Sequence, residues 1–336
     1  MRKDNILYTN SQITFTVKSL ISLPKIPLHF NITPGATIEP ANGSEQDFTH
    51  GPVIYTVTSE DGAWKRQYKV EFREAELPTL KFSFENCELI NVESFLFSYK
   101  YYSWFEYDKN GEKKDIWATG NQGFGMGNST TAPEAYPTAP DENGYSGKCV
   151  RMQTLDAGPL AGALKKYIAA GNLFIGKFDM DKALTSALQS TLMGKDNAFP
   201  EEPFRVTGYY KYKPGAEYWD KNKNVVKGKV DEADIYAVLY RNIDEDGNSV
   251  VLDGSDVLTS KYIVSKARVK SLPPTDEWKP FEMFFEDVAP VDQKKLKEYG
   301  YNLALVFSSS KEGANFCGAI GSTLYIDEVV ISLEKD

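Results

Sequence analysis

The chain has 336 residues, of which 41% are hydrophobic, 13% aromatic and 25% charged, so it can hold about two globular domains and its composition argues against disorder. It carries 38 Lys and Arg against 47 Asp and Glu, a net charge of -9 without a basic cluster, so we expect no nucleic-acid partner. Three cysteines without CxxC spacing and two histidines argue against a disulfide framework and a zinc site, and leave carboxylates as the candidates for any catalysis.

The N-terminal residues predict short strands separated by turns. Ile13, Phe15 and Val17 alternate with polar neighbours, and residues 54–58 and 68–72 are rich in β-branched and aromatic side chains. This pattern predicts a first domain, residues 1–76, that is a small β-sandwich of immunoglobulin type. It resembles the immunoglobulin-like domains that precede glycan-handling modules in secreted bacterial proteins, and the resemblance implies a spacer.

A short acidic segment with a proline, residues 74–79, predicts a linker to a second domain, residues 77–336. Strands are expected at residues 80–84, 204–212, 234–240, 279–286, 303–307 and 322–331. Several of them are apolar on both faces, which is typical of strands covered by a facing sheet and by loops. We therefore predict an all-β chain whose second domain is a larger two-sheet jelly roll.

Three parts of this domain do not look like strands. Residues 159–170 and 181–192 have helical composition, the latter with Leu184, Leu188 and Leu192 at steps of four, and they predict short helical insertions. Residues 118–147 are crowded with Gly, Pro, Ser, Thr and Asn, which marks a long, candidate functional loop.

The second domain resembles a known family. Residues 117–121, 170–178, 206–215 and 321–329 match, in order, blocks of the putative carbohydrate metabolism domain, and the resemblance runs from about Leu80 to the C-terminus. It implies a jelly roll like that of carbohydrate-binding modules, with a polysaccharide or oligosaccharide as the partner. It also implies export to the periplasm or outer-membrane surface of a Gram-negative bacterium, with a lipid anchor on a leader that is removed. No apolar run is long enough for a transmembrane segment.

The same resemblance implies one metal ion. In jelly-roll carbohydrate-binding modules the first and last strands pair, and an early Glu and a late Asp often hold a structural calcium ion. Here the matching residues are Glu85 and Asp327, and carboxylate oxygens suit calcium. The alternative is that both are surface charges at strand ends, and no other cofactor is expected.

Aromatic side chains near the long loop are the candidates for glycan binding. Trp104, Trp117 and Trp219 each adjoin polar loop sequence, and Asn121 follows Trp117 closely. Sugar rings stack their C–H faces on such side chains while amides bond the hydroxyls, so we expect these four residues to be exposed ligand contacts. The alternative is that they belong to the core. Our leading hypothesis is an exported glycan-binding protein.

A glycoside hydrolase is the first alternative, with Glu282, Glu286 and Asp234 as candidate catalytic residues. A retaining enzyme needs two carboxyl groups roughly 5 Å apart. Glu282 and Glu286 are four residues apart on one expected strand, about 13 Å, so each would need a partner from another strand. The second alternative is a cell-surface adhesion or assembly component that pairs through open edge strands.

Three apparent motifs are discounted. The glycines of residues 123–127 lack dinucleotide spacing and predict a flexible loop, and residues 244–248 predict a hairpin turn instead of a calcium loop. The serines of residues 308–310 have no histidine in their domain, which argues against a serine hydrolase.

Overall fold

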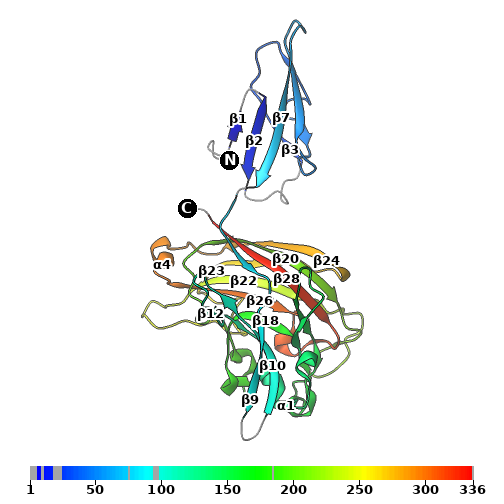
Figure 1. Cartoon of the computed structure of the whole chain (residues 1–336), viewed down its shortest axis with the longest axis vertical. Coiled ribbons are helices and arrows are strands. Elements are labelled where there is room, and N and C mark those ends of the chain that lie inside the picture. Colours follow the sequence, from blue (N-terminus) through cyan, green and yellow to red (C-terminus); the bar gives the residue numbers. More distant parts are fainter. Residues whose placement is uncertain are drawn as a thin grey trace. The chain divides into compact units, whose positions relative to one another are not determined.

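A computed structural model describes residues 6–8, 11–17, 25–74, 76–93, 98–183 and 185–334. Strands make up 45% of it and helices 10%, so the predicted all-β class is confirmed. The chain divides into two compact units, Met1–Leu77 and Pro78–Asp336 (Figure 1). None of the helices in the described ranges has the length and apolar character needed to span a membrane.

The first unit is the predicted immunoglobulin-like β-sandwich. One sheet has the order β1-β2-β7-β6-β4, with strands Ile6–Tyr8, Gln12–Val17, Lys65–Glu74, Val53–Thr58 and Thr37–Glu39. A ribbon of two strands, β3 and β5, spans Ile26–Pro27 and Glu45–Gln46. Its core includes Phe15 stacked on Phe72, with ring centroids 4.8 Å apart, and Phe48 against the same ring.

The second unit is a jelly roll of two sheets. The seven-stranded sheet has the order β13-β18-β26-β22-β23-β25, with β19 beside β18, and its strands are Trp117–Ala118, Asn172–Phe178, Tyr301–Ser308, Asp234–Arg241, Ile263–Arg268, Glu286–Asp287 and Thr191–Met193. The six-stranded sheet has the order β14-β15-β28-β20-β24, with β8 beside β28, and its strands are Thr138–Asp141, Cys149–Gln153, Thr323–Leu333, Pro203–Lys213, Thr275–Phe284 and Thr79–Phe82.

Shorter elements surround the two sheets. Four ribbons pair β9 with β10, β11 with β12, β16 with β17, and β21 with β27: Cys87–Glu93 and Ser98–Trp104, Glu106–Tyr107 and Lys113–Lys114, Leu155–Asp156 and Ile168–Ala169, Tyr218–Trp219 and Gly318–Ala319. The helices α1 to α4 are Asn121–Gly127, Gly158–Ala163, Met180–Ala183 and Gln293–Lys297. Single 3-10 turns, η2 to η4, are Pro133–Ala135, Ala187–Ser190 and Gly313–Asn315.

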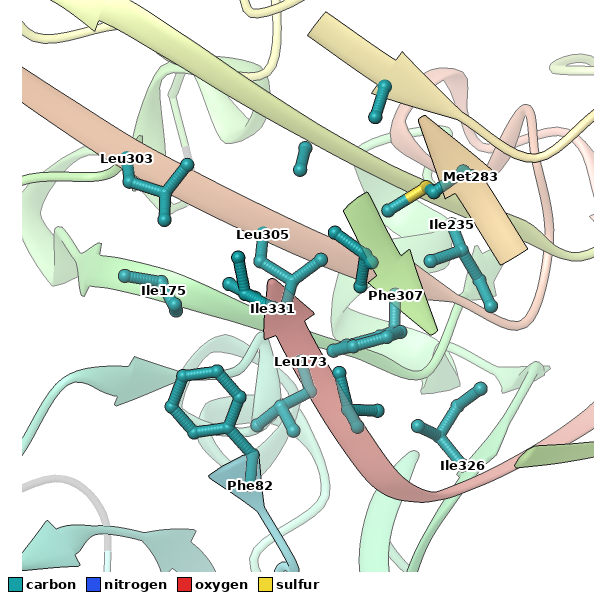
Figure 2. Packing of buried hydrophobic residues seen from close by; sticks show 14 of the residues in the cluster. Phe82, Leu173, Ile175, Ile235, Met283, Leu303, Leu305, Phe307, Ile326 and Ile331 are labelled. Carbon is teal, nitrogen blue, oxygen red and sulfur yellow. The ribbon is translucent and has the colours of Figure 1, made fainter. Parts of the chain in front are cut away.

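The main core fills the space between the two sheets. Figure 2 shows side chains of both sheets meeting there, and the labelled residues are Phe82, Leu173, Ile175, Ile235, Met283, Leu303, Leu305, Phe307, Ile326 and Ile331. Burial of each such side chain contributes about 1.5–3 kcal/mol. Because the inward faces of the two sheets cover each other, their outward faces are the surfaces available for binding.

A β-bulge interrupts the last strand, β28. Ile326 and Val329 both face the core although strict alternation would place them on opposite faces. Glu328 has a φ of 47°, and the pairing of β28 with β20 shifts register beside it. This extra residue turns the carboxylate of Asp327 into a buried position under a neighbouring loop.

The helical insertions correct one prediction. The glycine run at residues 123–127, expected as a flexible loop, lies in helix α1. A Cβ at Gly125 would lie 2.3 Å from Tyr99 Cδ2, so glycine lets this helix pack directly on the tyrosine ring. The short helices α2 and α3 are insertions as predicted, whereas Leu184 lies outside the described residues. The predicted turn at residues 244–248 is confirmed by the bridge between Ile243 and Ser249.

Candidate functional site

Two of the tryptophans predicted to be exposed are buried. Trp104 is 1% exposed and Trp117 is 4% exposed, and both belong to the core between the sheets. The ring of Trp117 meets that of Phe82 edge-on at 5.2 Å. Both tryptophans are next to polar residues in the sequence, but their own side chains point into the core. The expectation that these two residues are exposed is therefore wrong.

Asn121 is also buried, and Trp219 is half-buried. The Asn121 side chain donates to the carbonyl of Thr138 at 2.7 Å and accepts from its N–H at 3.1 Å, so it anchors helix α1. The ring of Trp219 lies under Lys223, whose Nζ is 4.9 Å from the ring centroid. Of the four predicted contacts, Trp219 alone is partly exposed.

Trp117 is held by a carboxylate, which leads to a prediction on pH. Its Nε1 donates to Glu106 Oε1 at 2.9 Å, and burial raises the pKa of Glu106 although this hydrogen bond opposes the shift. A raised folded-state pKa means that stability is lost as the pH rises from the unfolded pKa, about 4.3, towards the folded one. Glu106→Gln keeps an acceptor without a charge, so the thermal stability of the variant relative to wild type should increase as the pH rises above about 4. Thermal unfolding of both proteins across this range measures the gain.

The matched control is Glu217→Gln, at an exposed residue. Its midpoint should follow that of wild type at every pH. A Glu106→Gln curve parallel to wild type would contradict the raised pKa.

The three candidate catalytic carboxylates do not come together. Glu282, on β24, forms an ion pair with Arg205, with Oε1 and Nη1 3.1 Å apart. Glu286 is exposed on β25, which belongs to the other sheet. Both line a cavity of about 660 Å³ at the sheet edges, and Asp234 does not. The chain changes sheets between the two glutamates, which strand alternation in the sequence does not reveal.

The best-formed candidate site is a groove on the outer face of the seven-stranded sheet, with a volume of about 230 Å³. Two rows of side chains across β18, β26 and β22 form its floor. The first row is apolar and aromatic, with Phe174 opposite Val306 and Val306 opposite Tyr236. The second row is polar and consists of Asn172, Ser308 and Asp234.

Short insertions wall this groove. They are helices α1 and α2 and the 3-10 turns η3 and η4, and their apolar contributions are Phe124, Leu160, Leu164, Leu188 and Phe316. The predicted functional loop and both predicted helical insertions thus take part in one site. A largely apolar cleft with a few fixed polar groups is typical of small-ligand sites.

The charged groups of the groove are mostly fixed by partners. Asp234 accepts two hydrogen bonds from Arg268, 2.9 Å from Nε and 2.7 Å from Nη2, and the pair raises the pKa of that guanidinium. Lys166 Nζ donates to the carbonyl of Ala183 at 3.2 Å, and burial lowers its pKa. Among the described residues that line the groove, Asp234 is the only one with a carboxylate.

One wall of the groove rests on a buried polar network around Asp231. Its Oδ2 accepts from Ser310 Oγ at 2.6 Å, Ser322 Oγ at 2.7 Å and the N–H of Ala319 at 2.7 Å. Burial raises the pKa of Asp231, and these hydrogen bonds oppose the shift. Because Ser310 lines the groove, this network joins the groove wall to the segments that carry Asp231, Ala319 and Ser322.

Glu85 and Asp327, the predicted calcium ligands, approach the same loop, residues 142–148. Glu85 Oε1 accepts from the N–H of Lys148 at 2.9 Å, and Asp327 Oδ2 accepts from that of Ser146 at 2.9 Å. Strands β8 and β28 pair as the resemblance implied. No cluster of three or more metal-ligating side chains occurs within the described ranges, so a calcium ion here would also need backbone carbonyls.

The sequence prediction missed the residues of the groove floor. Strands β18, β22 and β26 are apolar on both faces, so periodicity did not show which face is closed by the other sheet. Asp234 was the one floor residue singled out, for a different role.

Comparisons with known proteins relate both parts of the chain to families. The model of the family "Putative carbohydrate metabolism domain" matches residues 83–332, and that of "SGBP, N-terminal" matches residues 2–71. Two solved structures are similar, each named as a putative glycoside hydrolase. One, from Bacteroides thetaiotaomicron VPI-5482, is 37% identical with a TM-score of 0.68, over 98% of this chain and 93% of that one. The other, from Bacteroides vulgatus ATCC 8482, is 34% identical with a TM-score of 0.68, over 76% of this chain and 98% of that one. No curated protein matches the chain.

Proposed function

Because the chain belongs to the putative carbohydrate metabolism domain family, as its sequence predicts, we propose that the groove on the seven-stranded sheet binds a carbohydrate. The observation that carries the proposal is that an apolar floor, partly exposed aromatic walls and a polar row lie in one groove. The partly exposed rings of Phe124 and Phe316 suit the C–H face of a sugar ring. Asn172, Ser308 and Asp234 line the same groove, where hydroxyl groups need partners.

The size and rigidity of the groove indicate which part of a glycan it takes. A volume of about 230 Å³ is small for a ligand site and suits the end of a glycan better than an internal stretch of polymer. The polar groups are already oriented: Asn172 Oδ1 accepts from the N–H of Gly120 at 2.9 Å, and Arg268 holds Asp234. Such preorganisation lowers the entropy lost on binding.

Binding without cleavage fits this site better than hydrolysis. Asp234, the only carboxylate among the described lining residues, is tied to Arg268, whereas a retaining hydrolase needs two carboxyl groups about 5 Å apart. Hydrolysis is the second candidate because two similar structures are named as glycoside hydrolases and because Glu282 and Glu286 line one cavity.

We also propose that the protein is exported to the surface of a Gram-negative cell and held there by a lipid anchor. The similar proteins come from Bacteroides, and the first unit matches the "SGBP, N-terminal" family. Cell fractionation, with surface proteolysis of intact cells, tests this proposal.

A glycan array tests the function. Wild-type protein should bind a defined set of glycans, and the bound glycan incubated with protein should release no new reducing ends. New reducing ends that Glu282→Gln or Glu286→Gln abolishes would establish the hydrolase instead. A blank array that includes plant, host and microbial glycans would overturn carbohydrate binding and favour the adhesion or assembly role.

We propose further that calcium is held by Glu85 and Asp327 and stabilises the loop of residues 142–148. The carbonyl of Gly147 and the carboxylate of Asp327 both lie close to Gly144, so oxygen atoms gather there. At a calcium concentration about 100 times its dissociation constant, thermal unfolding should shift upward by roughly 5–10 °C relative to a chelator. Asp327→Asn should abolish the shift. Identical midpoints with calcium and chelator would mean that the two carboxylates only clamp the loop.

A further inference from the structure

A row of alternating cationic and aromatic side chains crosses the outer face of the six-stranded sheet. It consists of Arg151 on β15, Tyr325 on β28, Lys211 on β20 and Trp278 on β24. Arg151 is opposite Tyr325, and Tyr325 is opposite Lys211. A register shift between β20 and β24 lies beside Trp278, whose ring Lys211 contacts. We call these four residues the cation–aromatic row.

The two cations of this row have no carboxylate partner. Lys211 Nζ lies 4.6 Å from the ring centroid of Trp278 and 4.8 Å from that of Tyr325. Arg151 donates to the backbone carbonyls of Glu134 and Tyr136 at 2.7 and 3.1 Å. Within the described part of the chain, no acidic side chain forms an ion pair with either cation. In a chain of net charge -9, these two cations on one face are therefore free to pair with an anionic ligand.

The charges around the row are mixed at its edge. Burial lowers the pKa of Arg151, and the charge of Asp141 on the neighbouring strand β14 opposes this shift. Asp141 Oδ1 also accepts hydrogen bonds from Asn143. Glu328 is near enough to Tyr209 for its charge to act on the tyrosine hydroxyl. Neither carboxylate forms an ion pair with Lys211, whose ammonium group lies between the two rings.

An exposed aromatic stack adjoins the row. Tyr145 lies flat on Tyr209, with ring centroids 3.6 Å apart and planes 9° apart, and Trp278 meets it edge-on at 6.4 Å. Tyr145 is 49% exposed, so part of its side chain is accessible to a ligand. Asp327 and Glu85 clamp the loop that carries Tyr145 and so fix its ring before any ligand arrives.

We propose that this face is a second carbohydrate site, specific for an acidic polysaccharide whose sugars carry carboxylates. A pyranose ring stacks on Tyr145, and its carboxylate pairs with the ammonium group of Lys211. A neutral sugar would leave the ammonium group of Lys211 without a carboxylate partner, whereas a uronate supplies the complementary charge. This site lies on the sheet opposite the groove and does not depend on ligand binding there.

Titration calorimetry with a short oligogalacturonate and its methyl ester tests the proposal at low ionic strength. Wild-type protein should bind the acid about tenfold more tightly than the ester, which has the same rings without the charge. Lys211→Met keeps an apolar stem between the two rings, so it should reduce affinity for the acid about tenfold and leave the ester unchanged. Tyr145→Ala should weaken both ligands, and added salt should weaken only the acid.

The matched control is Lys223→Met, which removes another lysine that lies over a tryptophan, 4.9 Å from the ring of Trp219. It should bind the acid as wild type does, and a substitution that fills the groove, Ala161→Trp, should also leave this affinity intact. Equal affinity of wild type for acid and ester, no measurable binding of the acid, or equal losses in Lys211→Met and Lys223→Met would overturn the proposal.

Discussion

Ala161→Trp should reduce binding of the groove ligand by more than about 100-fold, because a bulky side chain would occupy the space that the ligand needs. Ala161 lies in helix α2 and lines the groove, whose volume is about 230 Å³. An indole at this position replaces ligand contacts with protein contacts. Affinity for the glycan identified on the array, measured by calorimetry, gives the size of the loss.

The chain offers a close control in the next residue. A Cβ at Gly162 would meet no atom within 4 Å, so Gly162→Trp adds the same indole to the same helix but directs it into open space. This variant should bind as wild type does, and both variants should unfold at about the wild-type temperature. Equal affinity of Ala161→Trp and wild type would show that the ligand binds elsewhere.

Asp231→Ala should be the most destabilising of the substitutions considered, at about 3–5 kcal/mol. Asp231 is 3% exposed and accepts hydrogen bonds from two serine hydroxyls and from two backbone N–H groups, those of Glu232 and Ala319. Its removal leaves the Ser322 hydroxyl and the N–H of Ala319 without this acceptor, whereas Ser310 Oγ keeps Thr154 Oγ1 at 2.6 Å. The loss should appear as a lower denaturation midpoint with an unchanged slope, because the surface exposed on unfolding stays the same.

The fluorescence of the second unit can be isolated for this measurement. Trp64 is the only one of the five tryptophans in the first unit, so a Trp64→Phe background reports on the second unit alone. Asp246→Ala, at an exposed residue of a turn, is the control and should change stability by less than about 0.5 kcal/mol. A similar midpoint for the two alanine variants would contradict the role of the Asp231 network.

Much of the fold could be predicted from local patterns. Strands such as β20, β26 and β28 have enough β-branched and aromatic residues to be identified, and ordered blocks of sequence identify the family. The all-β class depends on these local preferences. What local patterns do not specify is which of two apolar faces meets the other sheet, and the groove floor lies on such strands.

The site residues were harder to predict for a related reason. Trp104 and Trp117 adjoin polar sequence, but exposure depends on side-chain direction and on what covers the strand, which only tertiary structure defines. Tyr145 and Trp278 are 133 residues apart (278 − 145) and meet through loop placement and a register shift. Conversely, Glu85 and Asp327 lie at one loop because strand pairing, which the family resemblance implied, brings them there.

The bulge at Glu328 constrains how this sequence can change in evolution. Ile326 lies before it and Val329 and Ile331 after it, and all three reach the core only because one extra residue separates the two halves of the strand. Deleting the bulge residue alone would leave Val329 and Ile331 on the core face but would remove the bend that buries Asp327. An insertion or deletion elsewhere in the strand would turn the apolar side chains on one side of it away from the core. Related chains should therefore exchange residue types within this strand while conserving its length, and should acquire insertions and deletions in the connecting loops instead.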